Sequence, residues 1–357
     1  MTRCILAAVA ALVSVPSQAA TIHTFAGTGV KGFSGDGGPA TVAKIDNPFG
    51  VVRGPDGDIY FCEYTGQRIR KVKGDGTIQT IGGNGSTGYT GDGGPALKAS
   101  LNKPHEIRFD KNGDLYMTDM ANHVIRKIDM KTGVISTIAG TGKQGHSGDG
   151  GSATKARLSK PHSLQFGPDG HLYICDIGNH VIRRVNMKTG KITRFAGTGK
   201  PGKTPDQSPI KGTPLKGPRT IDFDANGDMW LATREGNQVF RFDMKKQVIH
   251  HIAGTGKKGF TGNGGPAKKA TLSGPKGIAI DKAGNVYLAD TESHTVRMVN
   301  AKTGNLELIA GTGKAGNGNS KDPLKCAMDR LHGVYIDHDG SLFIGDSQAH
   351  KLRVIRW

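Results

Sequence analysis

Residues 102–140 read NKPHEIRFDKNGDLYMTDMANHVIRKIDMKTGVISTIAG, and residues 159–197 repeat the pattern 57 positions later as SKPHSLQFGPDGHLYICDIGNHVIRRVNMKTGKITRFAG. Each stretch holds four short runs of β-branched, aliphatic and aromatic residues, separated by turn signals such as Lys-Asn-Gly, Pro-Asp-Gly and Lys-Thr-Gly. Short runs with glycine-containing turns between them predict antiparallel hairpins. One repeat therefore predicts a four-stranded sheet.

The same pattern recurs along the whole chain. Its first strand is led by an anchor residue, and the anchors are Pro48, Pro104, Pro161, Pro218, Pro275 and Leu331, spaced 56 or 57 residues apart. A four-stranded unit cannot bury both of its faces alone, whereas radial stacking gives every sheet a neighbour. The repeats therefore predict an all-β fold, a six-bladed β-propeller of four-stranded blades.

The two ends of the repeat array are complementary. The last unit reads only as far as a third strand, HKLRVIRW at 350–357, whereas a fourth-strand pattern, TIHTFAGTG, begins at Thr21. We therefore expect the N-terminal strand to complete the last blade and close the ring. The predicted propeller domain covers residues 21–357.

Residues 1–20 differ from the repeats. Arg3 precedes an apolar run from Ile5 to Val15, and small residues follow before position 21. This order is typical of a secretory signal peptide, so we expect a secreted or periplasmic protein. No later apolar run reaches about 18 residues, and no membrane span is predicted. The odd number of cysteines beyond residue 20, three, argues against a disulfide framework.

Composition narrows the class of partner. The chain of 357 residues has a formal net charge of +18, and only 6% of its residues are aromatic. Its lysines and arginines recur with the repeat, whereas a nucleic-acid site needs one basic face with stacking aromatic residues. We therefore predict no nucleic-acid partner. We expect an anionic small molecule or glycan as the substrate, and a monomeric protein.

One slot of the repeat varies while its flanks do not. The residue after the anchor is, in blade order, Phe49, His105, His162, Arg219, Lys276 and His332. The first strand of a propeller blade lines the central channel, so these side chains should meet at one mouth of it. Grouped basic side chains are costly unless an anion, a metal ion or water lies among them. A ligand site and a solvated mouth both remain open on this pattern.

A second slot varies directly after the acidic residue that ends the second strand. Blade 1 has Glu63 followed by Tyr64, and blade 4 has Thr233 followed by Arg234, where the other blades have aspartate. Tyr64 and Arg234 should project over the same mouth. A tyrosine can transfer a proton, and an arginine can hold a carboxylate in bidentate fashion.

These two slots predict a site with three kinds of group. Three neutral imidazoles suit zinc or a similar divalent metal ion with one open position, and the expected metal ligands are His105, His162 and His332. We expect Arg219 and Lys276 to bind an anionic substrate. The expected catalytic residues are Tyr64 and Arg234, with Glu63 as a fallback base.

The repeats, such as GFSGDGGPA at 32–40 followed by the strand pattern quoted above, are similar to NHL repeats. NHL repeats form six-bladed propellers that include interaction domains, lyases and hydrolases, so the resemblance implies the fold more strongly than the function. The channel residues also resemble the site of peptidyl-α-hydroxyglycine α-amidating lyases, which hold a catalytic zinc on three channel histidines. The PHSL segment of that family is matched by 161–164, and its DREN-type segment, with a catalytic arginine, by 233–236.

The match to that lyase family has departures. Tyr64 is the nearest equivalent of the family's catalytic tyrosine, but it is offset by one residue. The histidines lie on blades 2, 3 and 6 rather than evenly around the ring, and Arg219 and Lys276 add charge at the mouth. These departures weaken what the resemblance implies about the substrate and the metal ion. They do not affect the predicted fold.

Three functions follow as hypotheses. The leading one is a secreted metal-dependent enzyme, a lyase that acts on a carboxylate-bearing substrate at the channel mouth. The second is a non-catalytic propeller that binds a protein or an acidic glycan. The third is a lactonase-like hydrolase, which would need acidic and asparagine side chains near the axis, and the channel slot has none.

Overall fold

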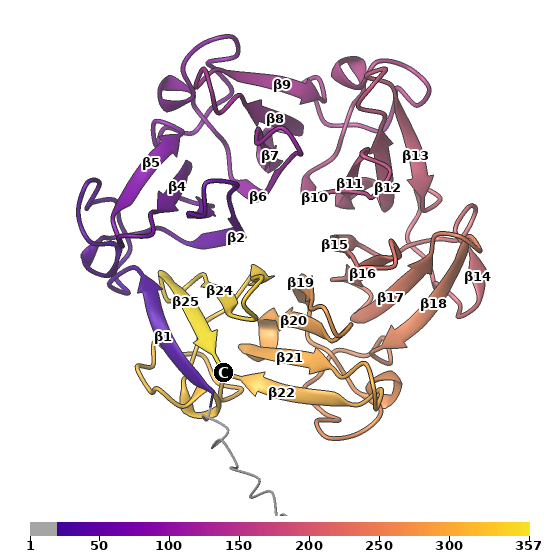
Figure 1. Cartoon of the computed structure of the whole chain (residues 1–357). Coiled ribbons are helices and arrows are strands. Elements are labelled where there is room, and N and C mark those ends of the chain that lie inside the picture. The colour runs from indigo at the N-terminus through magenta and orange to yellow at the C-terminus, as the bar shows by residue number, and fades with distance from the viewer. Residues whose placement is uncertain (1–19) are drawn as a thin grey trace, which may run out of the picture.

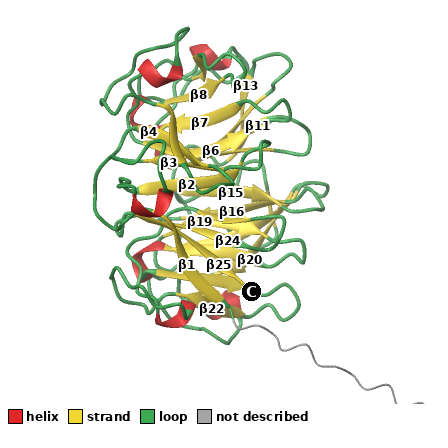
Figure 2. Cartoon of the chain, turned by 60° about the vertical axis from the view of Figure 1, so that its left-hand side comes forward, coloured by secondary structure: helices red, strands yellow, loops and turns green. Residues whose placement is uncertain are grey.

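The computed structural model describes residues 20–357, whose strands form six sheets around one central axis (Figure 1). The predicted six-bladed all-β propeller is confirmed. Turned by 60°, the molecule shows stacked strands in its interior, surrounded by loops and short helices (Figure 2). Nearly all of the predicted signal peptide, residues 1–19, lies outside the described residues. Within the described part, no helix is long and apolar enough to span a membrane.

The strands follow the repeat. Blade 1 contains β2 (Pro48–Arg53), β3 (Ile59–Glu63), β4 (Arg68–Val72) and β5 (Ile78–Gly82). Blade 2 contains β6 (Pro104–Phe109), β7 (Leu115–Asp119), β8 (Val124–Ile128) and β9 (Ile135–Ala139). Blade 3 contains β10 (Pro161–Phe166), β11 (Leu172–Asp176), β12 (Val181–Val185) and β13 (Ile192–Ala196). Blade 4 contains β15 (Pro218–Phe223), β16 (Met229–Thr233), β17 (Gln238–Asp243), β18 (Val248–Ala253) and the added β14 (Ser208–Pro209).

Blade 5 contains β19 (Pro275–Ile280), β20 (Val286–Asp290), β21 (Thr295–Val299) and β22 (Leu306–Ala310). Blade 6 contains β23 (Val334–Ile336), β24 (Leu342–Asp346), β25 (Lys351–Arg356) and β1 (Thr21–Ala26). Short 3₁₀ helices precede five blades: η1 (Ala40–Val42), η2 (Ala96–Lys98), η4 (Ala153–Lys155), η6 (Ala267–Lys269) and η8 (Pro323–Lys325). Three more follow second strands: η3 (Met120–Asn122), η5 (Ile177–Asn179) and η7 (Thr291–Ser293).

The ring closes as the sequence predicts. β1 pairs antiparallel with β25, with Thr21 opposite Arg356 and Ala26 opposite Leu352. Figure 1 shows this contact as the indigo strand beside the yellow one. The strand that closes the ring therefore comes from the opposite end of the described chain. Among the described residues, the only strand that the repeat pattern does not predict is β14, which has no counterpart in the other blades.

A buried arginine on the third strand stabilises every blade except the fourth. These residues are Arg70, Arg126, Arg183, Arg297 and Arg353, each at most 2% exposed. Each forms an ion pair with the acidic residue seven positions earlier, at 2.6 to 3.7 Å. Blade 4 has Thr233 and Phe240 at these two positions, so the acid and the arginine are lost together. The acidic residue that ends the second strand is thus half of a buried ion pair in these five blades.

The repeated histidines after the second strands link neighbouring blades. His123, His180, His294 and His350 adopt positive φ values of 50 to 58°. The Nδ1 atom of each accepts a backbone N–H bond from the residue before the next anchor, at 3.0 to 3.2 Å. Gln67 and Asn237 accept the same bond in the other two blades. These histidines therefore hydrogen-bond one blade to the next.

These inter-blade bonds should make the protein less stable in acid. Only a neutral imidazole can accept the bond, and burial lowers the pKa of His123 and of His350 below the usual 6.5. The stabilisation, about 1 kcal/mol per bond, should be complete above about pH 6.5 and decline as the pH falls through the lowered values. We expect the midpoint of urea unfolding to fall between pH 7.5 and pH 5.

The matched control replaces all four histidines by asparagine, because Asn237 already serves in this position. Comparing the two proteins at each pH removes the contribution of buried carboxyl groups, which titrate in the same range. The asparagine variant should lose less stability on acidification than the native protein. Equal losses in both would contradict the proposed role of the histidines.

Candidate functional site

The varying slot lies where the first strand changes its register with the second. In β10, β15 and β19 the pairing shifts between the anchor proline and the residue two positions later. A bulge of this kind bends the strand and redirects a side chain. It places His162, Arg219 and Lys276 at the irregular position, where their side chains turn toward the channel axis.

The slot residues of all six blades line one cavity. It has a volume of about 250 Å³, and its wall includes Phe49, His105, His162, Arg219, Lys276 and His332. Tyr64 and Arg234 from the second varying slot also line it. The structure therefore brings together every predicted site residue except Glu63.

An aromatic stack closes the blade 1 side of the cavity. The ring of Phe49 lies parallel to that of Tyr64, with centroids 4.3 Å apart, and to that of His332, at 3.8 Å. His105 meets Phe49 edge-on at 4.8 Å. The one apolar residue in the varying slot thus holds a candidate catalytic tyrosine and a histidine in place.

Arg219 is a buried cation without a counter-ion. It is 3% exposed, and within residues 20–357 it forms no ion pair with a carboxylate. Its Nη2 donates to His105 Nε2 at 2.6 Å, while its buried Nε has no partner. Burial, together with the charge of Arg234, lowers the pKa of Arg219 to about 9. Such a charge is costly to bury and is satisfied by an anion.

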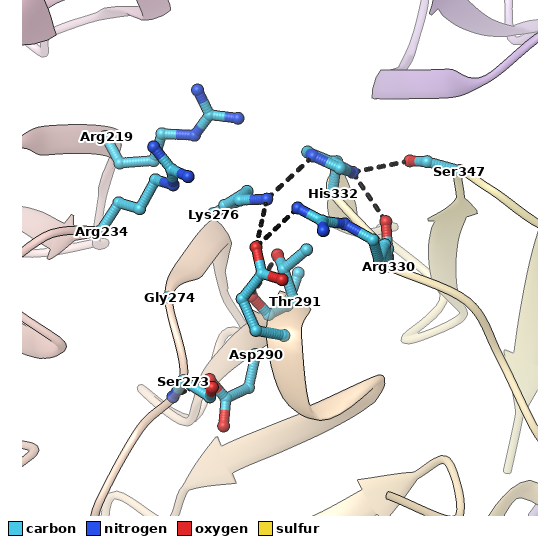
Figure 3. Close-up of polar contacts among 12 residues, drawn as sticks. Arg219, Arg234, Ser273, Gly274, Lys276, Asp290, Thr291, Arg330, His332 and Ser347 are labelled. Carbon is cyan, nitrogen blue, oxygen red and sulfur yellow. Dashed lines mark hydrogen bonds and ion pairs between the residues drawn. The ribbon is translucent and has the colours of Figure 1, made fainter. Parts of the chain in front are cut away.

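Lys276 shares one carboxylate with Arg330. Lys276 Nζ lies 2.9 Å from Glu292 Oε1, and Arg330 Nη2 lies 2.7 Å from the same atom. Figure 3 shows this network, with Arg219 and Arg234 side by side next to it. Burial and the charge of Arg219 lower the pKa of Lys276 to about 7. The mouth therefore carries more positive than negative charge.

The three predicted metal ligands do not present three free nitrogens. Arg219 donates to His105 Nε2, and Lys276 Nζ lies 3.3 Å from His332 Nε2. His162 uses Nδ1 to donate to Lys160 O at 2.6 Å. Burial lowers the pKa values of His105 and His332 well below 6.5, so both are neutral. Their lone pairs nevertheless face cations. No group of three His, Cys, Asp or Glu side chains arranged for a metal ion occurs between residues 20 and 357.

Glu63 lies away from the cavity. It is fully buried inside blade 1, where Oε1 accepts from Asp46 N at 3.2 Å and pairs with Arg70 at the same distance. Burial raises the pKa of Glu63 to about 7. The structure corrects the expectation of a fallback base, because Glu63 is the blade 1 member of the buried acid–arginine pairs.

The comparisons with known proteins agree with the propeller fold. A family model, the Teneurin NHL domain, matches residues 85–147 and 250–332. NHL repeat-containing protein 2 of Homo sapiens is 28% identical over 288 residues, covering 72% of this chain and 39% of that protein. This chain is a six-bladed propeller whose repeats are similar to NHL repeats. It spans about two fifths of the length of that curated relative.

Solved structures with the same fold include binding proteins and enzymes. An auxiliary nutrient binding protein from Bacteroides ovatus superposes with a TM-score of 0.69 at 16% identity, covering 95% of this chain and 76% of its own. Virginiamycin B lyase from Staphylococcus aureus gives 0.53 at 16%, covering 87% and 80%. A gluconolactonase from Xanthomonas campestris gives 0.58 at 13%, covering 87% and 86%. At these identities the likeness shows the fold alone.

Sequence reasoning missed Glu292 and Arg330. Glu292 directly follows the second varying slot of its blade, and Arg330 directly precedes an anchor position. The residues before the anchors are Asn47, Lys103, Lys160, Gly217, Gly274 and Arg330. Aligning this third slot across the six repeats would have shown that three of its members are cationic.

Proposed function

We propose that the channel mouth is the active site of an exported enzyme that acts on a carboxylate-bearing substrate by elimination. The observation that carries the proposal is Arg219, a buried guanidinium that lacks a carboxylate partner among the described residues. A substrate carboxylate supplies the missing charge, and a guanidinium binds it through two parallel hydrogen bonds. Export rests on the predicted signal peptide.

The residues around Arg219 suit the chemistry of elimination. A base takes the proton from the carbon next to the carboxylate, and the electrons of that C–H bond move into an enediolate. A C=C bond then forms as the bond to an oxygen leaving group breaks, and that oxygen takes up a proton. Arg219 would hold the carboxylate and, with Lys276, stabilise the enediolate that forms from it, while Arg234 would add positive charge beside it. Tyr64 would remove the proton and return it to the leaving oxygen.

Zinc on His105, His162 and His332 stays a prediction. If bound, zinc would polarise a substrate oxygen. In the present arrangement the residues do not fit it, because Arg219 and Lys276 engage the Nε2 atoms of His105 and His332. Proton transfer and charge stabilisation by side chains are therefore the simpler proposal.

An assay on polygalacturonate, an anionic glycan that bears carboxylates, tests the proposed elimination. Elimination creates a C=C bond conjugated to a carboxylate, which is followed by ultraviolet absorbance. We expect the native protein to produce this signal, and Tyr64→Phe to lower its rate about 10²–10⁴-fold. Tyr89→Phe is the matched control, because Tyr89 is 39% exposed and its hydroxyl bonds to Thr137.

The same assay separates the alternatives. A rate that a chelator abolishes and zinc restores would support the metal-dependent enzyme. A protein that binds galacturonate but forms no unsaturated product would support the second candidate, a non-catalytic binding propeller. That candidate is favoured by one specific observation, the engagement of His105 and His332 by cations, which leaves few groups free for catalysis.

Binding of galacturonate should weaken as the pH rises through about 7. Lys276 has a pKa of about 7, lowered by burial and by Arg219, so it carries its charge below that pH and loses it above. We expect the affinity to fall about tenfold between pH 6 and pH 8.5, measured by titration calorimetry. Lys276→Arg, which stays charged over this range, should remove the pH dependence. An unchanged pH dependence in this variant would rule out Lys276 as its source.

A further inference from the structure

The central cavity is small and has two larger neighbours. Its volume is about 250 Å³, below the roughly 300–1,000 Å³ usual for small-molecule sites. Each neighbour has a volume of about 430 Å³. One shares the walls Tyr64, His162 and Arg234 with the central cavity, and the other shares Arg234 and Arg330. The two larger cavities also share Arg234 and Glu235 with each other, so all three adjoin around Arg234, and a ligand held at Arg219 has room to extend into either neighbour.

The neighbour over blades 2 and 3 combines cations with an apolar floor. Its wall includes the exposed Lys103 and Lys160 and the nearly buried Met120 and Ile177. Lys103 Nζ lies 5.7 Å from the ring centroid of Tyr64. Met120 and Ile177 hold the same repeat slot as Tyr64, directly after the acidic residue. This side of the mouth therefore offers a cavity with an apolar floor edged by positive charge.

The neighbour over blades 4 to 6 is lined by charged groups. Its wall includes Arg234, Lys258 and Arg330, together with the carboxylates of Glu235 and Glu292. Arg234 pairs with Glu235 at 3.2 Å, and both side chains are more than a third exposed, so solvent screens that pair. Each of the three cavities thus has cations of its own.

The blade architecture does not require these cations. Lys103, Lys160 and Arg330 have φ values of 61, 51 and 47°, a region that favours glycine and asparagine. Gly217 and Gly274 hold the same slot in blades 4 and 5. Three blades therefore place a long cationic side chain at a backbone position that suits a smaller residue better, and each of these side chains lines a cavity at the mouth.

We infer that the ligand is an acidic oligosaccharide of at least three uronate units, which lies across the mouth with its central carboxylate at Arg219. The inference rests on the proposed function, since it names the substrate class of the same site. Three adjoining cavities that share Arg234, each with cations, match a chain with a repeated negative charge. The ring of Tyr64, which is partly exposed and lines two of the cavities, favours a sugar over an acidic peptide, because the C–H face of a sugar ring packs on an aromatic face.

Titration calorimetry with galacturonate and its dimer, trimer and tetramer tests the inference. We expect the affinity to rise at least about tenfold from monomer to trimer, and to change little from trimer to tetramer. Replacing Lys103 and Lys160 by glutamine should weaken the trimer about tenfold and leave the monomer unchanged. The matched control replaces Lys143 and Lys155, two exposed lysines outside the three cavities, and should bind both ligands normally.

The possible outcomes separate this inference from the proposed function. Equal affinity for monomer and trimer would overturn the extended ligand and leave the anion site at Arg219 standing. A protein that binds neither would overturn the proposed function as well. Tighter binding of tri-glutamate than of trigalacturonate would keep the three anionic subsites but overturn the sugar.

Discussion

Arg219→Met should abolish the binding of galacturonate and at the same time stabilise the protein. The guanidinium is 3% exposed and forms no direct ion pair with a carboxylate within residues 20–357, so its charge is buried with only the longer-range attraction of Glu235 and Glu106 in the free protein. Methionine has a similar length and removes that cost, which should raise the free energy of unfolding by about 1 kcal/mol or more. Removing one member of a buried charge pair with the ligand costs about 2–5 kcal/mol, so the affinity should fall at least about thirtyfold.

Two further variants show whether the effect belongs to the site. Arg219→Lys keeps the charge but loses the bidentate geometry, and it should bind with intermediate affinity. Arg241→Met removes an arginine of blade 4 that is partly exposed and lies 3.8 Å from Asp228, and it should bind normally. A structural role for Arg219 would lower the free energy of unfolding in Arg219→Met. Retained binding in that variant would contradict the anion site.

The fold was predictable because it depends on spacing. The 56- or 57-residue interval, the turn signals and the unmatched strand at Thr21 together determine the number of blades, the strand order and the ring closure. The meeting of the six slot side chains at one mouth of the channel was predictable for the same reason, since the symmetry of the ring brings equivalent positions to one axis. The added strand β14 was not, because it lies where blade 4 departs from the repeat.

The roles of the site residues were less predictable because they depend on individual side-chain contacts. The three histidines do lie at one mouth, but Arg219 and Lys276 engage two of them. The sequence pattern places Glu63 beside the site, because the other blades have a different residue there. In the structure, Glu63 instead forms a buried ion pair inside its blade with Arg70, seven residues later. Comparing Glu63–Arg70 with Thr233–Phe240 would have revealed this, because blade 4 changes both positions of the pair.

Asp176→Ala should lower the free energy of unfolding by about 1–3 kcal/mol, because it removes a buried acceptor from its donors. Asp176 is fully buried, accepts from Ser159 N at 2.6 Å, and lies 3.7 Å from Arg183 Nη1. The variant would leave both of these donors without that acceptor. The midpoint of urea unfolding measures the loss. Asp149→Ala is the matched control, because Asp149 pairs with the same arginine at 2.9 Å but its side chain is 40% exposed, and its loss should be below about 1 kcal/mol.

Blade 4 shows how a blade can compensate for the loss of the buried acidic residue. The double variant Asp176→Thr with Arg183→Phe reproduces the Thr233 and Phe240 of blade 4, where Phe240 is 1% exposed and Thr233 Oγ1 donates to Gln238 O at 3.1 Å. Removing both charges leaves neither unpaired, so the double variant should be more stable than the sum of its two single variants predicts, by about 1–3 kcal/mol. Additive losses would show that acid and arginine act independently. A positive coupling would explain why blade 4 has lost both residues rather than one.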